Sequence, residues 1–143
     1  MKATPYAYLI IRHFEGVRLI AYRCPSGIWT IGYGHTSGVK PDDTITQTQA
    51  NDLLEKDVEA VEAYLNRAQL NINQNQFDAL TSFIFNIGQT AFTMSTMARL
   101  IRKNPNDPAI ADEFRRWVHS NGQVLPGLQR RREEEAKLYF LKP

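Results

Sequence analysis

The chain has 143 residues, of which 43% are hydrophobic and 22% are charged, a balance typical of one globular domain. One cysteine excludes an internal disulfide and a multi-cysteine metal site, and three histidines without paired spacing give no reason to expect a metal or another cofactor. The net charge of +2 suits an anionic polymer but is too small for a dedicated nucleic-acid binder, so we expect no nucleic-acid partner.

The first residues predict a short helix that ends at an acidic side chain. Thr4 is a candidate N-cap, Pro5 suits the first helical position, and apolar residues recur at helical spacing until Gly16. Glu15 then lies at the negative end of the helix dipole, which we expect to hold its proton to higher pH, as a general acid requires. A solvated glutamate at a fraying helix end is the alternative interpretation.

A β-hairpin is predicted next, with strands at 18–22 and 28–36 joined by a type I turn of sequence CPSG. Alternation along the second strand would place Gly32 and Gly34 on one face, with Thr30 at its edge. Two glycines on one strand face are typical of a place where a ligand or another backbone comes close. His35 would lie on the opposite face, where a structural hydrogen bond is the simpler role.

The rest of the chain is predicted to be helical. Thr46 and Gln49 form a capping-box pattern before a long amphipathic helix, and Asn73 and Gln76 repeat it before a helix apolar nearly all round, closed by Gly88. Shorter helices are predicted at 95–103, 107–120 and 127–141. The expected fold class is α+β, mainly α, in a single domain with a small β lobe over about 13–45, a connecting helix over about 46–69 and a helical lobe over about 70–143.

Three arginines followed by three glutamates, at 130–135, are usually a solvated helix face, because they can pair at spacings of three and four residues. Arginines near the start of a helix oppose its dipole, however, and Arg-to-Glu is the weaker polarity for such pairs. One of these arginines is therefore a candidate to face Glu15 or a ligand, and we assign Arg131 to ligand binding.

The stretch EGVRLIAYRCPSGIWTIGYGHT resembles the catalytic segment of phage-type lysozymes, glycoside hydrolase family 24, in which Glu, eight residues, Asp, five residues and Thr form the signature. This chain keeps the spacing and carries Cys24 at the Asp position. The stretches FDALTSFIFNIG, STMARLI and PGLQRRREEEAKLYF are similar to second-lobe segments of lambdoid phage endolysins, so the resemblance covers almost the whole chain.

The resemblance implies a lysozyme-like fold in which Glu15 is the proton donor and Thr30 helps to hold the attacking water. Cys24 is a base once ionised, a nucleophile, or a neutral thiol that helps Thr30; the first and third roles are preferred. An ordinary thiol, with a pKa near 8.5, is only a few per cent ionised at neutral pH. A small buried apolar cysteine is the remaining alternative. The candidate substrate-binding residues are Gly32, Gly34, His35, Phe85, Asn86 and Arg131, with core packing the simpler role for Phe85.

The implied activity is a muramidase that cleaves peptidoglycan between N-acetylmuramic acid and N-acetylglucosamine with inversion, in a monomer that works with a holin-type membrane protein. The first apolar stretch, YAYLII, is too short for a signal peptide or a membrane span, so we expect the chain to stay in the host cytoplasm until release. Two alternatives remain: a lytic transglycosylase that needs Glu15 alone, and a wall-binding module that has lost catalysis through the change to cysteine.

Overall fold

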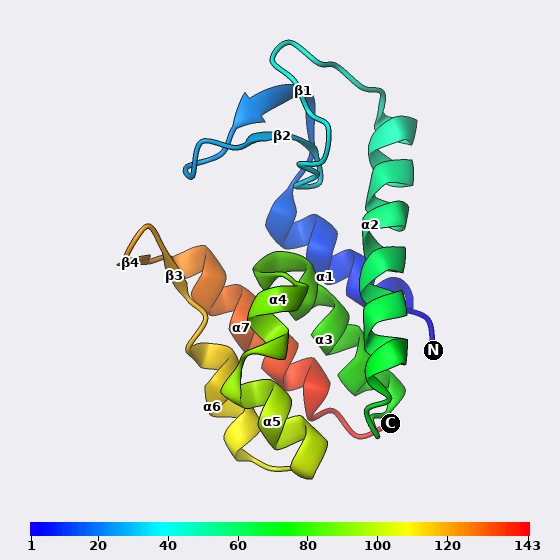
Figure 1. Cartoon of the computed structure of the whole chain (residues 1–143), viewed down its shortest axis with the longest axis vertical. Coiled ribbons are helices and arrows are strands. Elements are labelled where there is room, and N and C mark those ends of the chain that lie inside the picture. Colours follow the sequence, from blue (N-terminus) through cyan, green and yellow to red (C-terminus); the bar gives the residue numbers. More distant parts are fainter.

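The computed structural model describes residues 1–143 and consists of two small antiparallel sheets and seven helices. Figure 1 shows the β1–β2 hairpin at one end of the molecule, most of the helices at the other, and the long helix α2 running along one side between them. The expected class, α+β and mainly α, is confirmed. The division into lobes near residues 45 and 69 stays a prediction.

Helix α1 spans Pro5–Glu15 and starts and stops where the sequence predicts. Gly16, with φ of +66°, ends it, and the Gly16 N–H donates to the Arg12 carbonyl at 3.0 Å. The Thr4 side chain does not cap the helix; its hydroxyl and its N–H both donate to the buried carboxylate of Asp78 in α3. The start of α1 is therefore attached to the centre of the protein.

Strand β1 covers Arg18–Arg23 and β2 covers Trp29–Gly32, paired in antiparallel fashion with Tyr22 opposite Thr30. The predicted second strand is too long. Gly32 and Gly34 have φ of +64° and +76°, so the chain turns back on itself, and the Ile31 and His35 backbones bond to each other at 2.9 Å in both directions. Gly32 therefore ends β2 and Gly34 lies in the tight turn after it, so the two glycines do not share one strand face.

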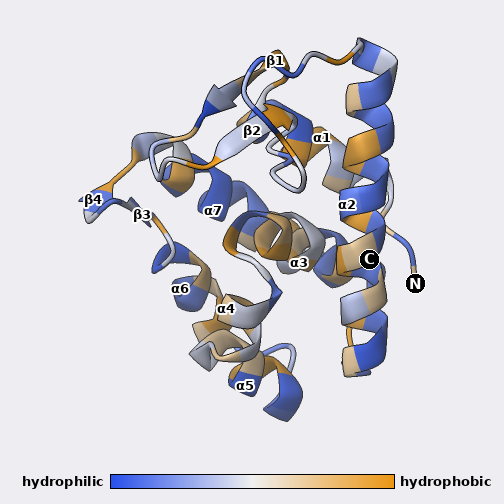
Figure 2. Ribbon diagram, turned by 45° about the horizontal axis from the view of Figure 1, so that its top comes forward, coloured by the Kyte–Doolittle hydropathy of each residue, from blue (hydrophilic) through white to orange (hydrophobic).

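Helix α2 spans Gln47–Ala68 and α3 spans Gln74–Ile87, and both begin with the predicted capping boxes at Thr46 and Asn73. Every residue of α3 from position 76 to 84 is buried, which confirms it as the central helix. Figure 2 shows apolar positions recurring along α1 and α3, whereas α2 carries polar positions along much of its length.

The remaining elements differ most from the prediction. Helices α5 (Thr96–Lys103) and α7 (Pro126–Tyr139) were expected, but α4 (Gln89–Thr93) was not. The helix predicted to reach residue 120 is α6 (Ala109–Arg115), and the strands β3 (His119–Ser120) and β4 (Gln123–Val124) follow it. Asn121 and Gly122 have positive φ angles of +51° and +77°, as the two central residues of a tight hairpin turn require. This turn is incompatible with a helix that continues to residue 120.

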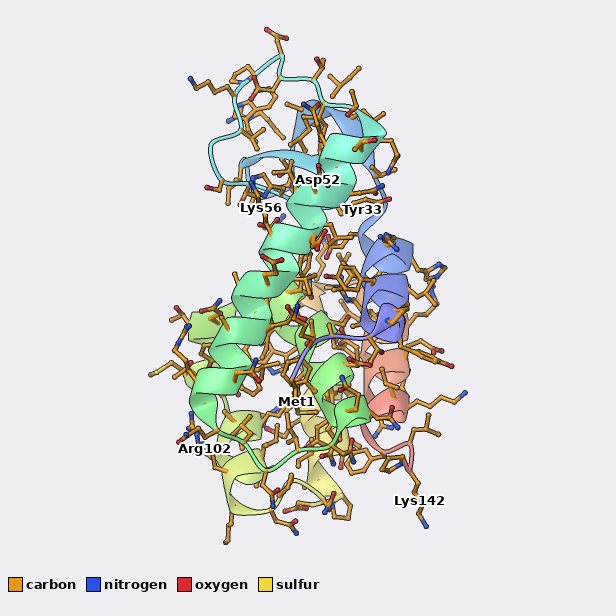
Figure 3. All side chains as sticks on the ribbon, turned by 90° about the vertical axis from the view of Figure 1, so that its right-hand side faces the viewer. Met1, Tyr33, Asp52, Lys56, Arg102 and Lys142 are labelled. Atoms are coloured by element: carbon orange, nitrogen blue, oxygen red, sulfur yellow. The ribbon has the colours of Figure 1, made fainter.

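Apolar side chains form two clusters. The larger has 16 buried residues from α2 to α7, and the smaller consists of Ile11, Tyr33, Ala50, Leu54 and Val58. Figure 3 shows Tyr33 beside the half of α2 that carries Asp52 and Lys56. Phe85, at the end of α3, packs against both clusters and so lies where the hairpin and the helices meet. No helix is both long enough and apolar enough to cross a membrane.

Candidate active site

Glu15 lies at the end of α1, where Gly16 takes the chain away toward the hairpin. Its side chain is 18% exposed, so solvent or a ligand reaches the carboxylate. Arg131 Nη1, from α7, donates to Glu15 Oε1 at 2.6 Å. This ion pair stabilises the negative charge on Glu15. The negative end of the α1 dipole acts in the opposite sense and destabilises it.

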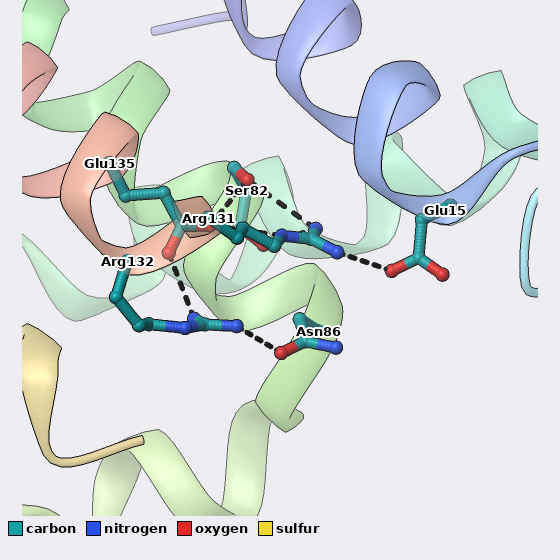
Figure 4. Close-up of polar contacts among 6 residues, drawn as sticks. All are labelled: Glu15, Ser82, Asn86, Arg131, Arg132 and Glu135. Atoms are coloured by element: carbon teal, nitrogen blue, oxygen red, sulfur yellow. Dashed lines mark hydrogen bonds and ion pairs between the residues drawn. The ribbon is translucent and has the colours of Figure 1, made fainter. Parts of the chain in front are cut away.

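Arg131 belongs to a buried chain of charges that Figure 4 shows running from α7 to Glu15. Arg131 Nε donates to Glu135 Oε2 at 3.2 Å, and Arg132 Nη1 donates to Glu135 Oε1 at 2.8 Å. Arg131, Arg132 and Glu135 are at most 2% exposed. The solvated-face interpretation is wrong for these three residues and holds only for Arg130, Glu133 and Glu134, which lie on the outer face of α7.

One arginine of this run does face Glu15, and it is Arg131, the residue that we assigned to ligand binding. All three guanidinium nitrogens are occupied, since Nη2 donates to the Ser82 carbonyl at 3.1 Å while Nε and Nη1 contact the two glutamates. Little hydrogen-bonding capacity remains for a ligand. A direct contact between Arg131 and the glycan stays a prediction, and the geometry favours a role through Glu15.

Gly34 is required next to Glu15. A Cβ atom at Gly34 would lie 2.7 Å from Glu15 Oε2, closer than the Cβ atoms of other residues come to a neighbouring atom. The corresponding position at Gly32 faces Ile45 and the Ala50 backbone of α2, at 3.5 and 3.7 Å. Gly34 therefore makes room at the site, whereas a Cβ at Gly32 would make ordinary contacts and only its φ of +64° favours glycine.

The turn at the hairpin tip brings Cys24 and Thr30 together. The Gly27 N–H donates to the Cys24 carbonyl at 2.8 Å, as the predicted turn requires. The Ser26 hydroxyl lies 2.9 Å from Cys24 Sγ. This hydrogen bond, with smaller contributions from the backbones of Ile28 and Ser26, lowers the pKa of Cys24 from its ordinary value to about 7. The thiol is therefore ionised more readily near neutral pH than an ordinary cysteine.

Thr30 is 3% exposed and its hydroxyl donates to the Ile28 carbonyl at 3.0 Å. That hydrogen bond fixes the direction of the hydroxyl proton and leaves its oxygen lone pairs as acceptors. Thr30 is therefore an ordered acceptor at the base of the hairpin turn, close to the thiol of Cys24.

Glu15 and Gly34 each line a different cavity. One, of about 600 Å³, is lined by Glu15 and by Pro25 from the hairpin turn, together with Asn86 and Arg131. The other, of about 280 Å³, is lined by Gly34, His35 and Phe85 among others. Because Phe85 and Asn86 are adjacent at the end of α3, each faces a different cavity.

His35 has a structural role that the structure makes clear. Its Nδ1 lies 2.7 Å from Asp57 Oδ2 in α2, and its Nε2 lies 3.0 Å from the Ser37 carbonyl. The ring therefore attaches the turn after β2 to α2, as the simpler interpretation expects. Contact with a ligand stays a prediction, supported by its position in the wall of the smaller cavity.

The second hairpin is the part of the site that the sequence interpretation missed. Ser120 and Leu125, at its two ends, line the larger cavity opposite Pro25. The dipeptide Asn121 and Gly122 was the available signal, because it is the most common sequence of a two-residue hairpin turn. The flanking strands have only two residues each, too few to show an alternating pattern.

Comparison with known proteins identifies the arrangement. The model of the phage lysozyme family matches residues 12–135, and an endolysin of Acyrthosiphon pisum secondary endosymbiont phage 1 is 43% identical over 97% of this chain and 98% of its own length. The chain belongs to the phage lysozyme family. The resemblance drawn from the motifs is thus confirmed.

Two further relatives support this membership of the phage lysozyme family. The muramidase domain of SpmX from Asticaccaulis excentricus has the same fold, with a TM-score of 0.88, 36% identity and 99% of each chain covered. An endolysin of Bacillus phage PZA is 42% identical over 97% of this chain, which spans 55% of that relative's length. As a phage lysozyme, the chain is a glycoside hydrolase that acts on peptidoglycan.

Proposed function

We propose that this phage lysozyme is an N-acetylmuramidase that hydrolyses the β-1,4 bond between N-acetylmuramic acid and N-acetylglucosamine with inversion at the anomeric carbon. The observation that carries the proposal is the position of Glu15. It is a partly exposed carboxyl that lines the larger cavity, in contact with a buried arginine and beside the glycine that leaves it room.

In this mechanism the Glu15 carboxyl protonates the glycosidic oxygen as the bond to the leaving sugar breaks. The ion pair with Arg131 stabilises the carboxylate that this proton transfer leaves behind. A water molecule attacks the anomeric carbon from the opposite face of the sugar, the side that we assign to Cys24 and Thr30. Inversion requires this separation, because the water must fit between the sugar and its activating group.

Cys24 is the group that we assign to activate this water. A thiol with a pKa of about 7 is sufficiently ionised at neutral pH to accept a proton, and Thr30 supplies an acceptor that orients the water. The exposed hairpin turn also argues against the small buried cysteine of the alternative interpretation, since Pro25, Ser26 and Gly27 are all exposed.

The test combines a product analysis with one variant. We expect purified peptidoglycan to give products with reducing ends, which appear first as the α-anomer in a time-resolved proton NMR spectrum. Anhydro-sugar ends would show a lytic transglycosylase, and the β-anomer would exclude inversion. Glu15→Gln should lower kcat by about 10² to 10⁴, the usual contribution of a general acid.

The third interpretation is tested in the same assay. A chain that binds purified cell walls but releases no product would be a wall-binding module, and the proposed enzyme would be rejected. Glu15→Gln should bind these walls as tightly as the parent, because the substitution keeps the size of the side chain and leaves the rest of both cavities intact.

We also propose that the chain lyses a bacterial host to release phage, as the endolysin names of its relatives suggest. In this role it acts as a monomer on periplasmic peptidoglycan after a holin-type protein has opened the membrane. Expression in Escherichia coli should cause lysis only together with a pore-forming membrane protein, and sedimentation should give a mass near 16.4 kDa. Lysis without a pore-former would exclude the holin requirement, and a mass near twice this value would exclude the monomer.

A further inference from the structure

Glu135 is a buried carboxylate to which the proposed mechanism assigns no role. It lies on α7, is 0% exposed and lines neither cavity. Its two oxygens accept from three side chains: Oε1 from Arg132 at 2.8 Å, and Oε2 from Ser82 at 2.5 Å and from Arg131 at 3.2 Å. A fully buried carboxylate is costly unless it is paired, so its presence requires an explanation.

The contacts of Glu135 fix the direction in which Arg131 points (Figure 4). The guanidinium group is planar, and two of its nitrogens are held from behind: Nε by Glu135 and Nη2 by the Ser82 carbonyl at 3.1 Å. These two contacts determine the plane and therefore the position of the third nitrogen, Nη1, which donates to Glu15 at 2.6 Å.

Glu135 also balances the charges behind Glu15. Arg131 and Arg132 place two positive charges in the interior, against Glu15 and Glu135 as the two negative ones. The other elements packed around Glu15 add no further ion pair, since α3 presents Ser82 and Asn86 and β1 presents Tyr22. Without Glu135, two buried guanidinium groups would act on Glu15 uncompensated and would favour its ionised form.

Arg132 shows how strongly this interior depends on Glu135. Its Nε has no hydrogen-bond partner, and burial lowers the pKa of Arg132 to about 10. Its remaining contacts are Glu135, the Asn86 side chain and the face of Phe83, 4.9 Å from the ring centroid. Glu135 is thus the only ionic partner of Arg132.

We propose that Glu135, supported by Ser82, is a positioning residue for the hydrolysis: it directs Arg131 at Glu15 and cancels one buried positive charge, so that Glu15 can carry the proton that it delivers. This inference rests on the proposed role of Glu15 as proton donor. Glu135 itself touches no substrate and acts only through Arg131.

The decisive variant is Glu135→Gln, which keeps the shape of the side chain and removes its charge. We expect kcat to fall about tenfold to a hundredfold with KM within about twofold, because the proton donor is misplaced while Glu135 itself lines neither cavity. Carbon-13 NMR of the Glu15 carboxyl, assigned with Glu15→Gln, should give a titration midpoint different from that of the parent, because both the charge behind Arg131 and its direction change.

Two further variants separate orientation from charge. Ser82→Ala removes a hydrogen bond to Glu135 but no charge, so it should lower kcat about threefold to tenfold and leave the Glu15 midpoint unchanged. Glu134→Gln is the matched control, because it makes the same substitution at the neighbouring exposed position of α7, and it should change neither quantity. Ser82→Ala also keeps the test valid if Glu135→Gln does not fold.

The outcomes distinguish this inference from the proposed function. A folded Glu135→Gln variant with the parent's kcat and Glu15 midpoint would overturn the inference, even if Glu15→Gln is inactive. A lower melting temperature without a shifted midpoint would reduce Glu135 to a structural residue and would likewise reject it. Full turnover by Glu15→Gln would reject the proposed function, and this inference with it.

Discussion

The side chain with the most unusual environment at the hairpin tip is Cys24. Three hydrogen-bonding groups of one turn converge on its sulfur and lower its pKa to about 7, although no positive charge contributes to the shift. The family signature has a carboxylate at this position, which is ionised at neutral pH without help. The turn of this chain therefore compensates, by local hydrogen bonds, for a group that is intrinsically a weaker acid.

Removing the Ser26 hydroxyl tests this explanation. Ser26→Ala should raise the pKa of Cys24 from about 7 toward its ordinary value, because Ser26 makes the largest contribution that stabilises the thiolate. The thiolate forms as the pH rises through the pKa, so the variant should be less ionised at pH 7 and should lose activity there. The rate of thiol alkylation against pH, with Cys24→Ser as the blank, measures the pKa directly.

The result of the Ser26 experiment also distinguishes the roles of Cys24. If the thiolate is the base, activity at pH 7 should fall severalfold in Ser26→Ala and recover at higher pH. If alkylation shows the raised pKa but the rate at pH 7 is unchanged, the neutral thiol only helps Thr30 to hold water.

A second prediction about a single residue concerns Gly34. Gly34→Ala should cost about 1 to 2 kcal/mol in the free energy of unfolding, because φ is +76°. It should also lower kcat about a hundredfold, because the new Cβ would displace the Glu15 carboxylate from 2.7 Å away. Thermal unfolding and initial rates measure the two effects.

Gly38→Ala is the matched control for this substitution. Its φ is +70°, but no atom lies within 4 Å of the added Cβ. The backbone cost should therefore be similar while activity stays near that of the parent. Equal losses of activity in the two variants would show that strain in the turn, and not contact with Glu15, is the cause.

At the scale of elements, local signals succeeded where a helix carries its own start and stop. Helices α2 and α3 both begin at a capping box in which two backbone N–H groups are satisfied by side chains within three residues. Such interactions need no tertiary partner, so the sequence predicts them well. The sequence analysis missed the two-residue strands β3 and β4 and the five-residue helix α4, because these elements are too short to show a hydrophobic period.

The cap of α2 gives a prediction about stability. Thr46→Ala should destabilise the protein by about 1 kcal/mol, because the Gln49 N–H loses the hydroxyl that it donates to at 3.1 Å. Chemical denaturation measures this change in unfolding free energy. Thr48→Ala, at the exposed second residue of the helix, should be neutral or slightly stabilising; an equal loss there would argue against the cap.

At the scale of the molecule, the site depends on residues that are far apart in the sequence. Glu15 and Arg131 are separated by 116 positions and meet because α1 and α7 both pack against α3. The same packing buries Glu135 beside Ser82, 53 positions away. Thr4, bonded to Asp78, fixes the other end of α1 to the same central helix. The direction of Glu15 is thus set at both ends of its helix.

The sequence by itself determined the helical fold class, the hairpin tip and the spacing of Glu15, Cys24 and Thr30, because caps, turns and hydrophobic periodicity act over a few residues. Only the tertiary structure decided that Arg131 faces Glu15 and that Gly34, not Gly32, makes room for it. It also decided that the charges at 131, 132 and 135 are interior. Burial and long-range pairing depend on which helix faces pack together, and a run of arginines and glutamates looks the same in a sequence whether it is solvated or buried.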